Sequence, residues 1–410
     1  MHKKLAFFLV PVTGCYMLAG IAVLDEILIF SIGLFVFLYR SEIKLPPLFN
    51  PLNLFLYIAF ISSIIGTLFI ATKSGRLVML FGSLILLHQF IPKIMYSKGS
   101  HRALFYGILL ICAIQVYLTG IFPHKTIDES VWAFQGTFWA GTAFTSYYIS
   151  AGIVLAIFLA RQHSENKFDQ LFLALLIVSL FTSVGMDSRF GILMTTILGG
   201  LFILRSFFHN LTSLSKNGSV NALMAIVFLG VGMIIFAFIL FDTLELQRGL
   251  VINELTEDRA QTNMGRKASG LADIDRIAFL LSGFFYIQDN FFQALFPMGT
   301  YSHQIILIDY YAYGADPARG GLVRPTGVPA FFVDYGLIAN IALFYWFVSR
   351  AFGALFSQNK LFEKILLFIL ISYSGLALIV VNLQDALLFY LILIFVESLK
   401  QNSYQFVREH

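Results

Sequence analysis

Long apolar runs dominate this chain, and they constrain its fold more than any other feature. A helix needs roughly 20 apolar residues to cross the hydrocarbon core of a bilayer. Runs of about that kind recur along the whole sequence, at 5–24, 27–40, 52–71, 77–92, 103–122, 139–160, 169–186, 190–208, 220–241, 329–348, 363–381 and 385–399. The sequence therefore predicts an all-α polytopic membrane protein with about 12 transmembrane helices.

The composition agrees with this prediction. Charged residues make up 12% of the chain and hydrophobic residues 58%, whereas soluble domains carry about 25% charged residues. The formal net charge of +4 is modest, and we interpret it through the positive-inside bias, not as a sign of nucleic-acid binding. Cys15 and Cys112 both lie in apolar runs, so they predict neither a metal motif nor a disulfide framework.

Lysine and arginine residues set the predicted orientation. With the N-terminus inside, the short outer loops hold few basic residues, namely Lys73, Arg76, Lys125 and Arg189. Both termini are then cytoplasmic, and the first run is an uncleaved span. The predicted parts are an N-terminal transmembrane bundle (1–241), a large periplasmic loop (242–328) and C-terminal transmembrane helices (329–410).

One apolar run inside the large loop, at 277–287, is too short to span a bilayer. Together with 291–296, we interpret it as an interfacial or re-entrant helix that packs on the bundle. If it did span, Arg350, Lys360 and Lys364 would lie outside, which the positive-inside rule disfavours.

The large loop also gathers cations. The guanidinium group of arginine matches the oxygens of a phosphate with two hydrogen bonds and stays charged at any working pH. Arg248, Arg259 and Lys267 have acidic neighbours at helical spacing, so ion pairing explains them more simply. The remaining candidates for holding a diphosphate are Arg266, Arg276, Arg319 and Arg324.

A second candidate is the hairpin tip that contains Asp187 and Arg189 between two apolar runs. Ionisable residues at membrane depth are costly, which favours a functional role for this pair. The alternative is an ordinary interfacial turn in which the side chain of Arg189 reaches back to the membrane surface.

The third candidate is Asp334, which follows a Pro/Gly turn at 324–329 and points toward the outer end of the next helix. Its carboxylate is suited to orienting an arginine or acting as a base, and the alternative is a buried Asp–Arg pair at a simple helix start. His303 is the sole histidine of the large loop, and a single histidine is more often structural than catalytic. The polar tip at 382–385 either lines the same cavity or is a plain polar turn.

Several signals are missing from the sequence. It has no Walker A loop and no cluster of His, Cys and carboxylates at metal-ligand spacing. We therefore predict no metal and no cofactor, and a nucleotide-driven pump has no support.

The layout resembles the bacterial O-antigen polymerases (Wzy family), within the wider group that includes the O-antigen ligases. The matching motifs are Ser188-Arg189-Phe-Gly191, the stretch from Arg276 to Gly299, and Asp334-Tyr-Gly336. Many relatives carry a His-Asn pair before the last of these helices. Here Arg-Pro-Thr-Gly stands there instead and His303 lies earlier, which leaves the identity of the base open.

The resemblance implies a glycosyltransferase of lipopolysaccharide biosynthesis in the bacterial cell inner membrane. It would transfer a growing glycan from undecaprenyl diphosphate to a new undecaprenyl-diphosphate-linked repeat unit at the periplasmic face, alongside a polysaccharide chain-length regulator. Arg189, Arg266, Arg276, Arg319 and Arg324 would bind the diphosphate, and Arg189 and Arg276 would also be catalytic. Asp334 or Asp187, and less readily His303, would be the base. The alternatives are ligase-like transfer to lipid A-core, and a flippase or transporter of lipid-linked oligosaccharides.

Overall fold

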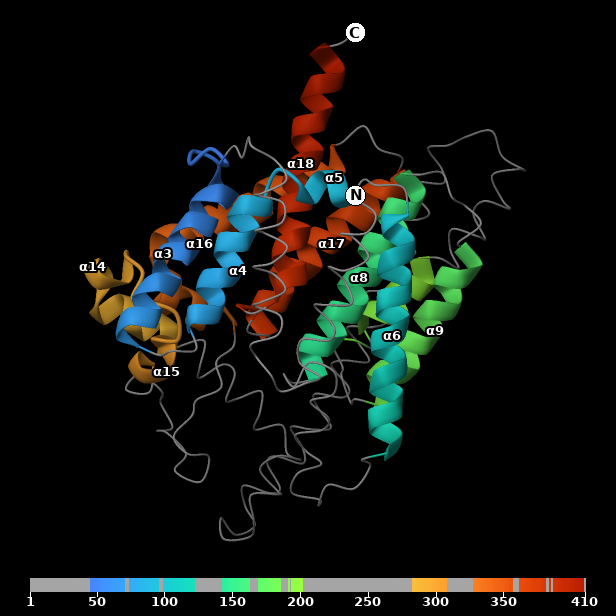
Figure 1. The fold of residues 1–410 in the computed structure, drawn as a ribbon, viewed down its shortest axis with the longest axis horizontal. Coiled ribbons are helices and arrows are strands. Elements are labelled where there is room, and N and C mark those ends of the chain that lie inside the picture. The colour runs from blue at the N-terminus through green and yellow to red at the C-terminus, as the bar shows by residue number, and fades with distance from the viewer. Residues whose placement is uncertain are drawn as a thin grey trace.

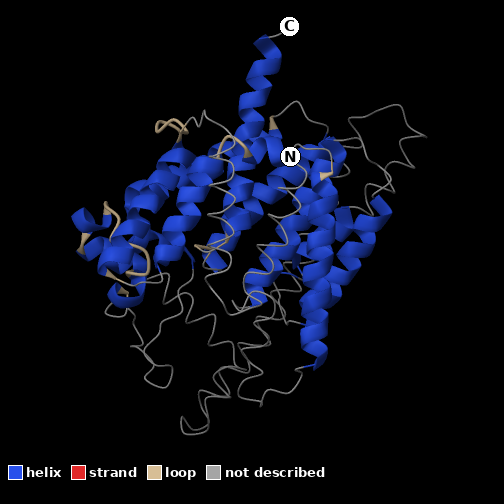
Figure 2. Ribbon diagram, viewed as in Figure 1, coloured by secondary structure: helices blue, strands red, loops and turns tan. Residues whose placement is uncertain are grey.

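A computed structural model gives the arrangement of the helices. It describes residues 45–70, 74–95, 99–121, 142–162, 169–185, 191, 193–201, 282–307, 327–356, 361–380, 383–384 and 386–408. All regular secondary structure within these ranges is helical (Figure 2). The prediction of an all-α protein is confirmed for this part of the chain.

The helices of the first half are α3 (Pro51–Phe69), α4 (Ser74–Leu87), α5 (Ile91–Met95), α6 (Ser100–Ile121), α8 (Thr142–Gln162) and α9 (Asp169–Gly185), followed by helical residues at 193–201. Those of the second half are α14 (Phe291–Ala294), α15 (His303–Ile306), α16 (Gly327–Leu355), α17 (Leu361–Val380) and α18 (Leu387–Arg408). Residues 282–289 are also helical and precede α14.

Three of the described helices are long and apolar enough to cross a membrane: Pro51–Phe69, Gly327–Leu355 and Leu361–Leu378. This supports a helical membrane protein. The predicted spans at 5–24, 27–40 and 220–241 lie outside the described residues. The count of about 12 spans and the cytoplasmic termini therefore stay predictions.

The stretch 77–92, predicted as one span, is not a single continuous helix. The structure divides this stretch into α4, which ends at Leu87, and the short α5, which begins at Ile91. Pro92 explains the division, because a proline ring inside a helix clashes with the carbonyl group four residues earlier, here that of His88.

The described helices form two groups that α17 and α18 join (Figure 1). One group holds α3, α4, α14, α15 and α16, and the other holds α6, α8 and α9. Helix α17 packs against both α16 and α8, and α18 contacts α3, α4, α5 and α8. The C-terminal helix α18 thus packs against helices from the first half of the chain.

Buried aromatic rings fix α16 against α3, α4 and α18. The ring of Tyr335 meets that of Phe55 edge-on at 5.6 Å and that of Phe81 edge-on at 6.0 Å. Phe81 in turn meets Tyr390 at 5.0 Å. Each such pair contributes about 0.5–1.5 kcal/mol beyond the burial of its area, so this cluster holds the start of α16 in one place.

Helix α16 is broken at Gly336, where φ is 77° and ψ is 163°. Glycine is needed here because an added Cβ would lie 2.6 Å from the carbonyl carbon of Phe296. The side-chain amide of Asn340 donates 2.7 Å hydrogen bonds to the carbonyl oxygens of Phe331 and Gly336. These bonds join the part of α16 before the break to the part after it.

The buried Glu397 of α18 joins that helix to the later part of α16, beyond the break at Gly336. Its carboxylate accepts hydrogen bonds from Trp346 Nε1, from the guanidinium group of Arg350 and from Asn50 Nδ2, all at 2.7 Å. Because Asn50 also caps the first turn of α3, this cluster connects three helices. A second polar cluster lies nearer the start of α16.

Candidate functional site

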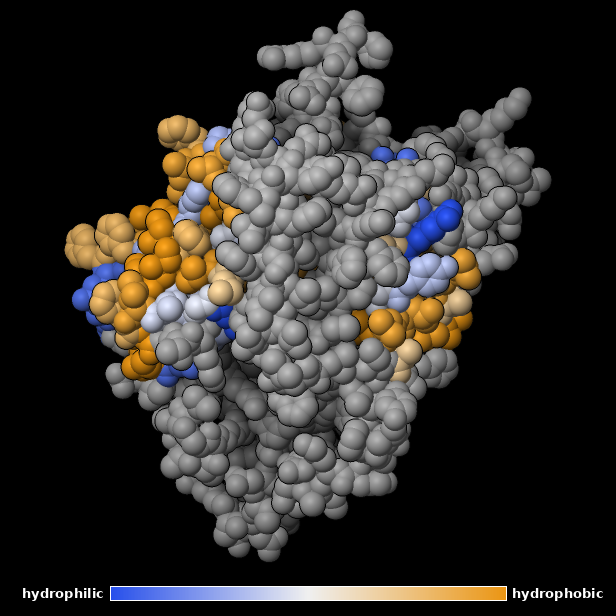
Figure 3. All heavy atoms as spheres, in the orientation of Figure 1, coloured by the Kyte–Doolittle hydropathy of each residue, from blue (hydrophilic) through white to orange (hydrophobic). Residues whose placement is uncertain are grey.

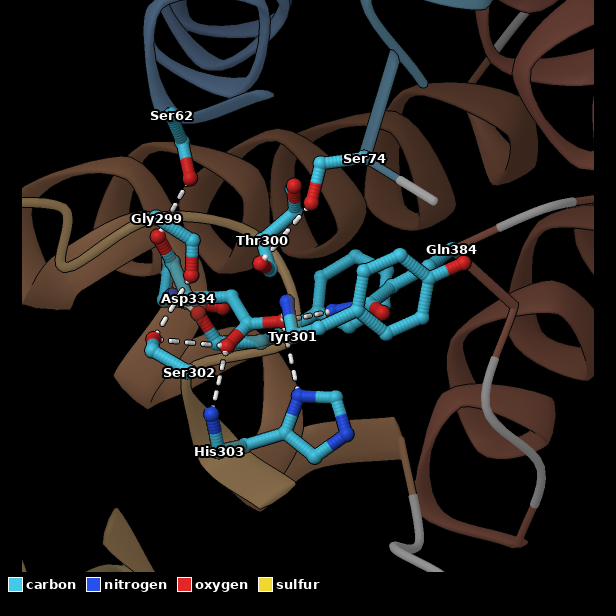
Figure 4. Close-up of polar contacts among 11 residues, drawn as sticks. Ser62, Ser74, Gly299, Thr300, Tyr301, Ser302, His303, Asp334 and Gln384 are labelled. Atoms are coloured by element: carbon cyan, nitrogen blue, oxygen red, sulfur yellow. Dashed lines mark hydrogen bonds and ion pairs between the residues drawn. The ribbon is translucent and has the colours of Figure 1, made fainter. Parts of the chain in front are cut away.

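The second polar cluster surrounds the carboxylate of Asp334, which lies in α16 just before the break at Gly336 and is fully buried (Figure 4). Its Oδ1 atom accepts hydrogen bonds from His303 N at 2.9 Å and Ser302 Oγ at 3.1 Å. Its Oδ2 atom accepts from Tyr301 N at 2.8 Å and Gln384 Nε2 at 2.6 Å, and lies 2.7 Å from His303 Nδ1. Both oxygens of this buried carboxylate are thus engaged by protein groups.

The backbone of residues 299–303 curls around this carboxyl group. Gly299 has φ of 103° and Tyr301 has φ of 69°, and positive φ values are uncommon for residues other than glycine. In this conformation the amides of Tyr301 and His303 both point at Asp334, as in the backbone concavities that bind anions. The carboxylate thus holds a turn that would otherwise be strained.

The same turn is fastened to α3 and α4. Thr300 N donates to the carbonyl oxygen of Ser62 at 3.2 Å, and Ser74 Oγ donates to Thr300 O at 3.2 Å. Ser62 Oγ also donates to the backbone oxygen of Asp334 at 2.6 Å. Gly66 makes this approach possible, because an added Cβ would lie 2.5 Å from Thr300 Oγ1. Four segments far apart in the sequence therefore meet at Asp334.

His303 is oriented by this arrangement. The Nδ1 atom of His303 lies 2.7 Å from Asp334 Oδ2 and donates a hydrogen bond to it in the tautomer that carries the proton on Nδ1. In the neutral ring the Nε2 atom then has a lone pair to offer. Nε2 is buried, and no described residue forms a hydrogen bond with it; Figure 4 shows it on the side of the ring away from the carboxylate. This ring thus has one nitrogen in contact with Asp334 and one whose hydrogen-bonding capacity the described residues leave unused.

The structure thus brings together two of the site residues predicted from the sequence, Asp334 and His303. Among the described residues the ionic partner of Asp334 is this histidine, and the pairing of Asp334 with an arginine stays a prediction. The other predicted site residues, Asp187, Arg189, Arg266, Arg276, Arg319 and Arg324, lie outside the described residues. Their roles stay predictions.

Gln384 is the residue of the polar tip at 382–385 that contacts this cluster. Its side chain is buried and bonded to Asp334, whereas Asn382 and Asp385 lie outside the described residues. Tyr301 and Ser302 were not predicted. Their only signal in the sequence is their position beside His303, because their role depends on backbone conformation.

The part of the chain that the structure describes contains no group of three or more His, Cys, Asp or Glu side chains suited to a metal ion. No protein-family model, curated protein or solved structure matches the chain. The chemistry of the site therefore rests on the geometry of its own residues.

Proposed function

We propose that this chain is a membrane glycosyltransferase that polymerises lipid-linked oligosaccharide repeat units. In this proposal, the growing glycan passes from undecaprenyl diphosphate to a repeat unit on a second undecaprenyl diphosphate at the periplasmic face of the bacterial inner membrane. The observation that carries it is the buried Asp334–His303 pair, whose Nε2 atom has no protein partner among the described residues and which lies at one end of an apolar helix bundle.

The reaction needs a base. The hydroxyl oxygen of the acceptor sugar forms a bond to the anomeric carbon of the donor, and the bond from that carbon to the diphosphate breaks. The hydroxyl proton goes to Nε2 of His303, and the electron pair leaves with the lipid diphosphate. General bases in this position typically contribute about 10²–10⁴-fold to the rate.

The geometry favours His303 over Asp334 as the base, which reverses the order expected from the sequence. Both oxygens of Asp334 already accept hydrogen bonds within the protein. Asp334 instead orients the imidazole ring and stabilises the positive charge that the ring acquires, as carboxylates do in other carboxylate–histidine pairs.

Stabilising the leaving group is the second requirement. Arg189, Arg266, Arg276, Arg319 and Arg324 are the residues proposed for binding the diphosphate. Removing one prepositioned donor of this kind typically lowers the rate by about 10²–10³-fold. A ligase-like transfer to lipid A-core would need the same base and the same donor, so these residues do not distinguish the two reactions.

The distinguishing experiment is to delete the gene in its host and separate the surface polysaccharide on a gel. A polymerase is expected to leave a single repeat unit on the lipid core, and the full ladder is expected to return with the wild-type gene. Loss of all capped core would point instead to a ligase or a flippase, and would refute the proposal.

A further inference from the structure

A cluster of exposed phenylalanine side chains lies on the segment before the site. We name this cluster the aromatic collar, and it consists of Phe284, Phe285, Phe291, Phe292 and Phe296. Phe292 has 81% of its surface exposed and Phe296 has 62%. Figure 3 shows apolar side chains gathered over the side of the molecule that carries α3 and α14. Soluble surfaces rarely expose so many large apolar groups together.

The opposite face of this segment packs on the bundle. Tyr286, Ala294 and Leu307 form a buried cluster with Val333 of α16. An added Cβ at Gly283 would lie 3.0 Å from Pro329, so the helix at 282–289 lies against the first turn of α16. The collar is therefore the outward face of a segment whose inward face is fixed.

The contacts with α3 place this segment beside a helix that is long and apolar enough to cross the membrane. Thr300, which follows the collar, is hydrogen-bonded to the backbone of Ser62. Ser62 precedes the end of α3 at Phe69 by about 10 Å, at a rise of 1.5 Å per residue. The final part of α3 exposes Leu68 and Phe69 as well. The collar thus continues an apolar surface that belongs against lipid.

Two exposed polar residues limit how deep the segment lies. Gln288 and Asp289 follow Phe284 and Phe285 on the same exposed side and precede Phe291. A carboxylate in the hydrocarbon core is costly, whereas the boundary between headgroups and acyl chains accepts polar and aromatic groups side by side.

We infer that the aromatic collar is a membrane-contact surface seated at this boundary in one leaflet, with its phenylalanine rings among the lipid acyl chains and Asp289 at the level of the headgroups. This selects the interfacial position over the re-entrant one. It also places the adjacent turn that holds His303 next to the membrane surface. The inference does not depend on the proposed reaction.

The test uses nitroxide spin labels in the full-length protein. Cys15 and Cys112 are replaced by serine, and Phe292→Cys and Asp289→Cys are made separately, labelled and placed in nanodiscs of phosphatidylcholine and phosphatidylglycerol. Phe344→Cys on the exposed face of α16 is the lipid reference. Collision with oxygen reports contact with acyl chains, and collision with a water-soluble nickel chelate reports contact with water.

The label at position 292 is expected to match the lipid reference, with severalfold greater oxygen than nickel accessibility, and the label at 289 is expected to show the reverse. Nickel accessibility at both positions would indicate an aqueous or protein-binding face, and would overturn the inference. Oxygen accessibility at both would indicate a re-entrant segment, and would overturn it equally. Phe292→Trp, quenched by brominated lipids in the unlabelled protein, gives an independent measurement.

Discussion

The Nδ1 atom of His303 lies 2.7 Å from a carboxylate oxygen of Asp334. This pair joins the first residue of α15 to the part of α16 that precedes the break at Gly336. The contact leaves the opposite nitrogen of the ring without a described protein partner. The two ring nitrogens of His303 therefore differ. Nδ1 contacts Asp334, and Nε2 is the atom that would accept a proton in the proposed reaction.

Replacement of His303 tests its role as the base. His303→Gln keeps a side chain able to donate a hydrogen bond to Asp334 but removes the basic nitrogen. We expect glycan extension in proteoliposomes to fall by about 10²–10⁴-fold, with the protein still folded by size-exclusion chromatography. Ile305→Ala, at an exposed position on the same short helix, is expected to keep near wild-type activity. Full-length ladders from His303→Gln would show that another group is the base.

Asp334→Asn tests the anion at the centre of the site. The amide NH₂ group of asparagine would face hydrogen-bond donors such as Gln384 Nε2 and Tyr301 N. Each buried donor left unpaired costs about 1–3 kcal/mol, so the thermal unfolding temperature in detergent should fall markedly and activity should be lost. The exposed Asp289→Asn is the matched control and should unfold like wild type. Equal unfolding temperatures for both variants would show that the carboxyl group of Asp334 does not hold the turn.

Two glycine substitutions in α16 should have opposite effects. Gly336→Ala adds a Cβ within 2.6 Å of Phe296 at a positive φ, so we expect strong destabilisation and loss of activity. Gly353→Ala adds a Cβ with nothing within 4 Å, and alanine favours a helix over glycine by about 0.5–1 kcal/mol. The thermal unfolding temperatures of the two variants, measured in detergent, distinguish these outcomes. A Gly336→Ala protein as stable as Gly353→Ala would mean that the break in α16 is not required.

Glu397→Gln tests the cluster at the other end of α16. Breaking a buried ion pair by removing one charge typically costs about 3–5 kcal/mol, and here it leaves the guanidinium group of Arg350 unmatched. We expect a lower unfolding temperature, partly restored by adding Arg350→Met. Glu363→Gln, at an exposed contact with Gln162, should change little. Additive effects of the two substitutions would show that Arg350 and Glu397 are not coupled.

The apolar runs were enough to predict a helical membrane protein, because a bilayer admits few structures other than helices. Boundaries within those runs depended on single residues. Pro92 divides a predicted span into α4 and α5, and its effect was readable from the sequence. The break at Gly336 was not, because glycine is also common inside unbroken membrane helices.

The candidate site was predicted residue by residue, but its arrangement was not. Asp334 and His303 were each named, yet nothing in the spacing of 31 residues between them indicates contact. The contact depends on support from Ser62, which is 272 residues from Asp334, and from Gln384, 50 residues away. Such long-range packing is set by the whole bundle. The proposed diphosphate-binding arginines lie outside the described residues, so their placement stays a prediction.

The hydrogen bonds of Asn340 stabilise the broken part of α16, which carries Asp334. They hold the broken part of α16 from within the same helix, through the carbonyl oxygens of Phe331 and Gly336. The carboxylate of Asp334, just before this break, is held in addition by the backbone amides of Tyr301 and His303 and by Gln384. Asp334 and His303 are therefore held in place by the contacts of the protein itself, which is the condition that a preorganised site requires.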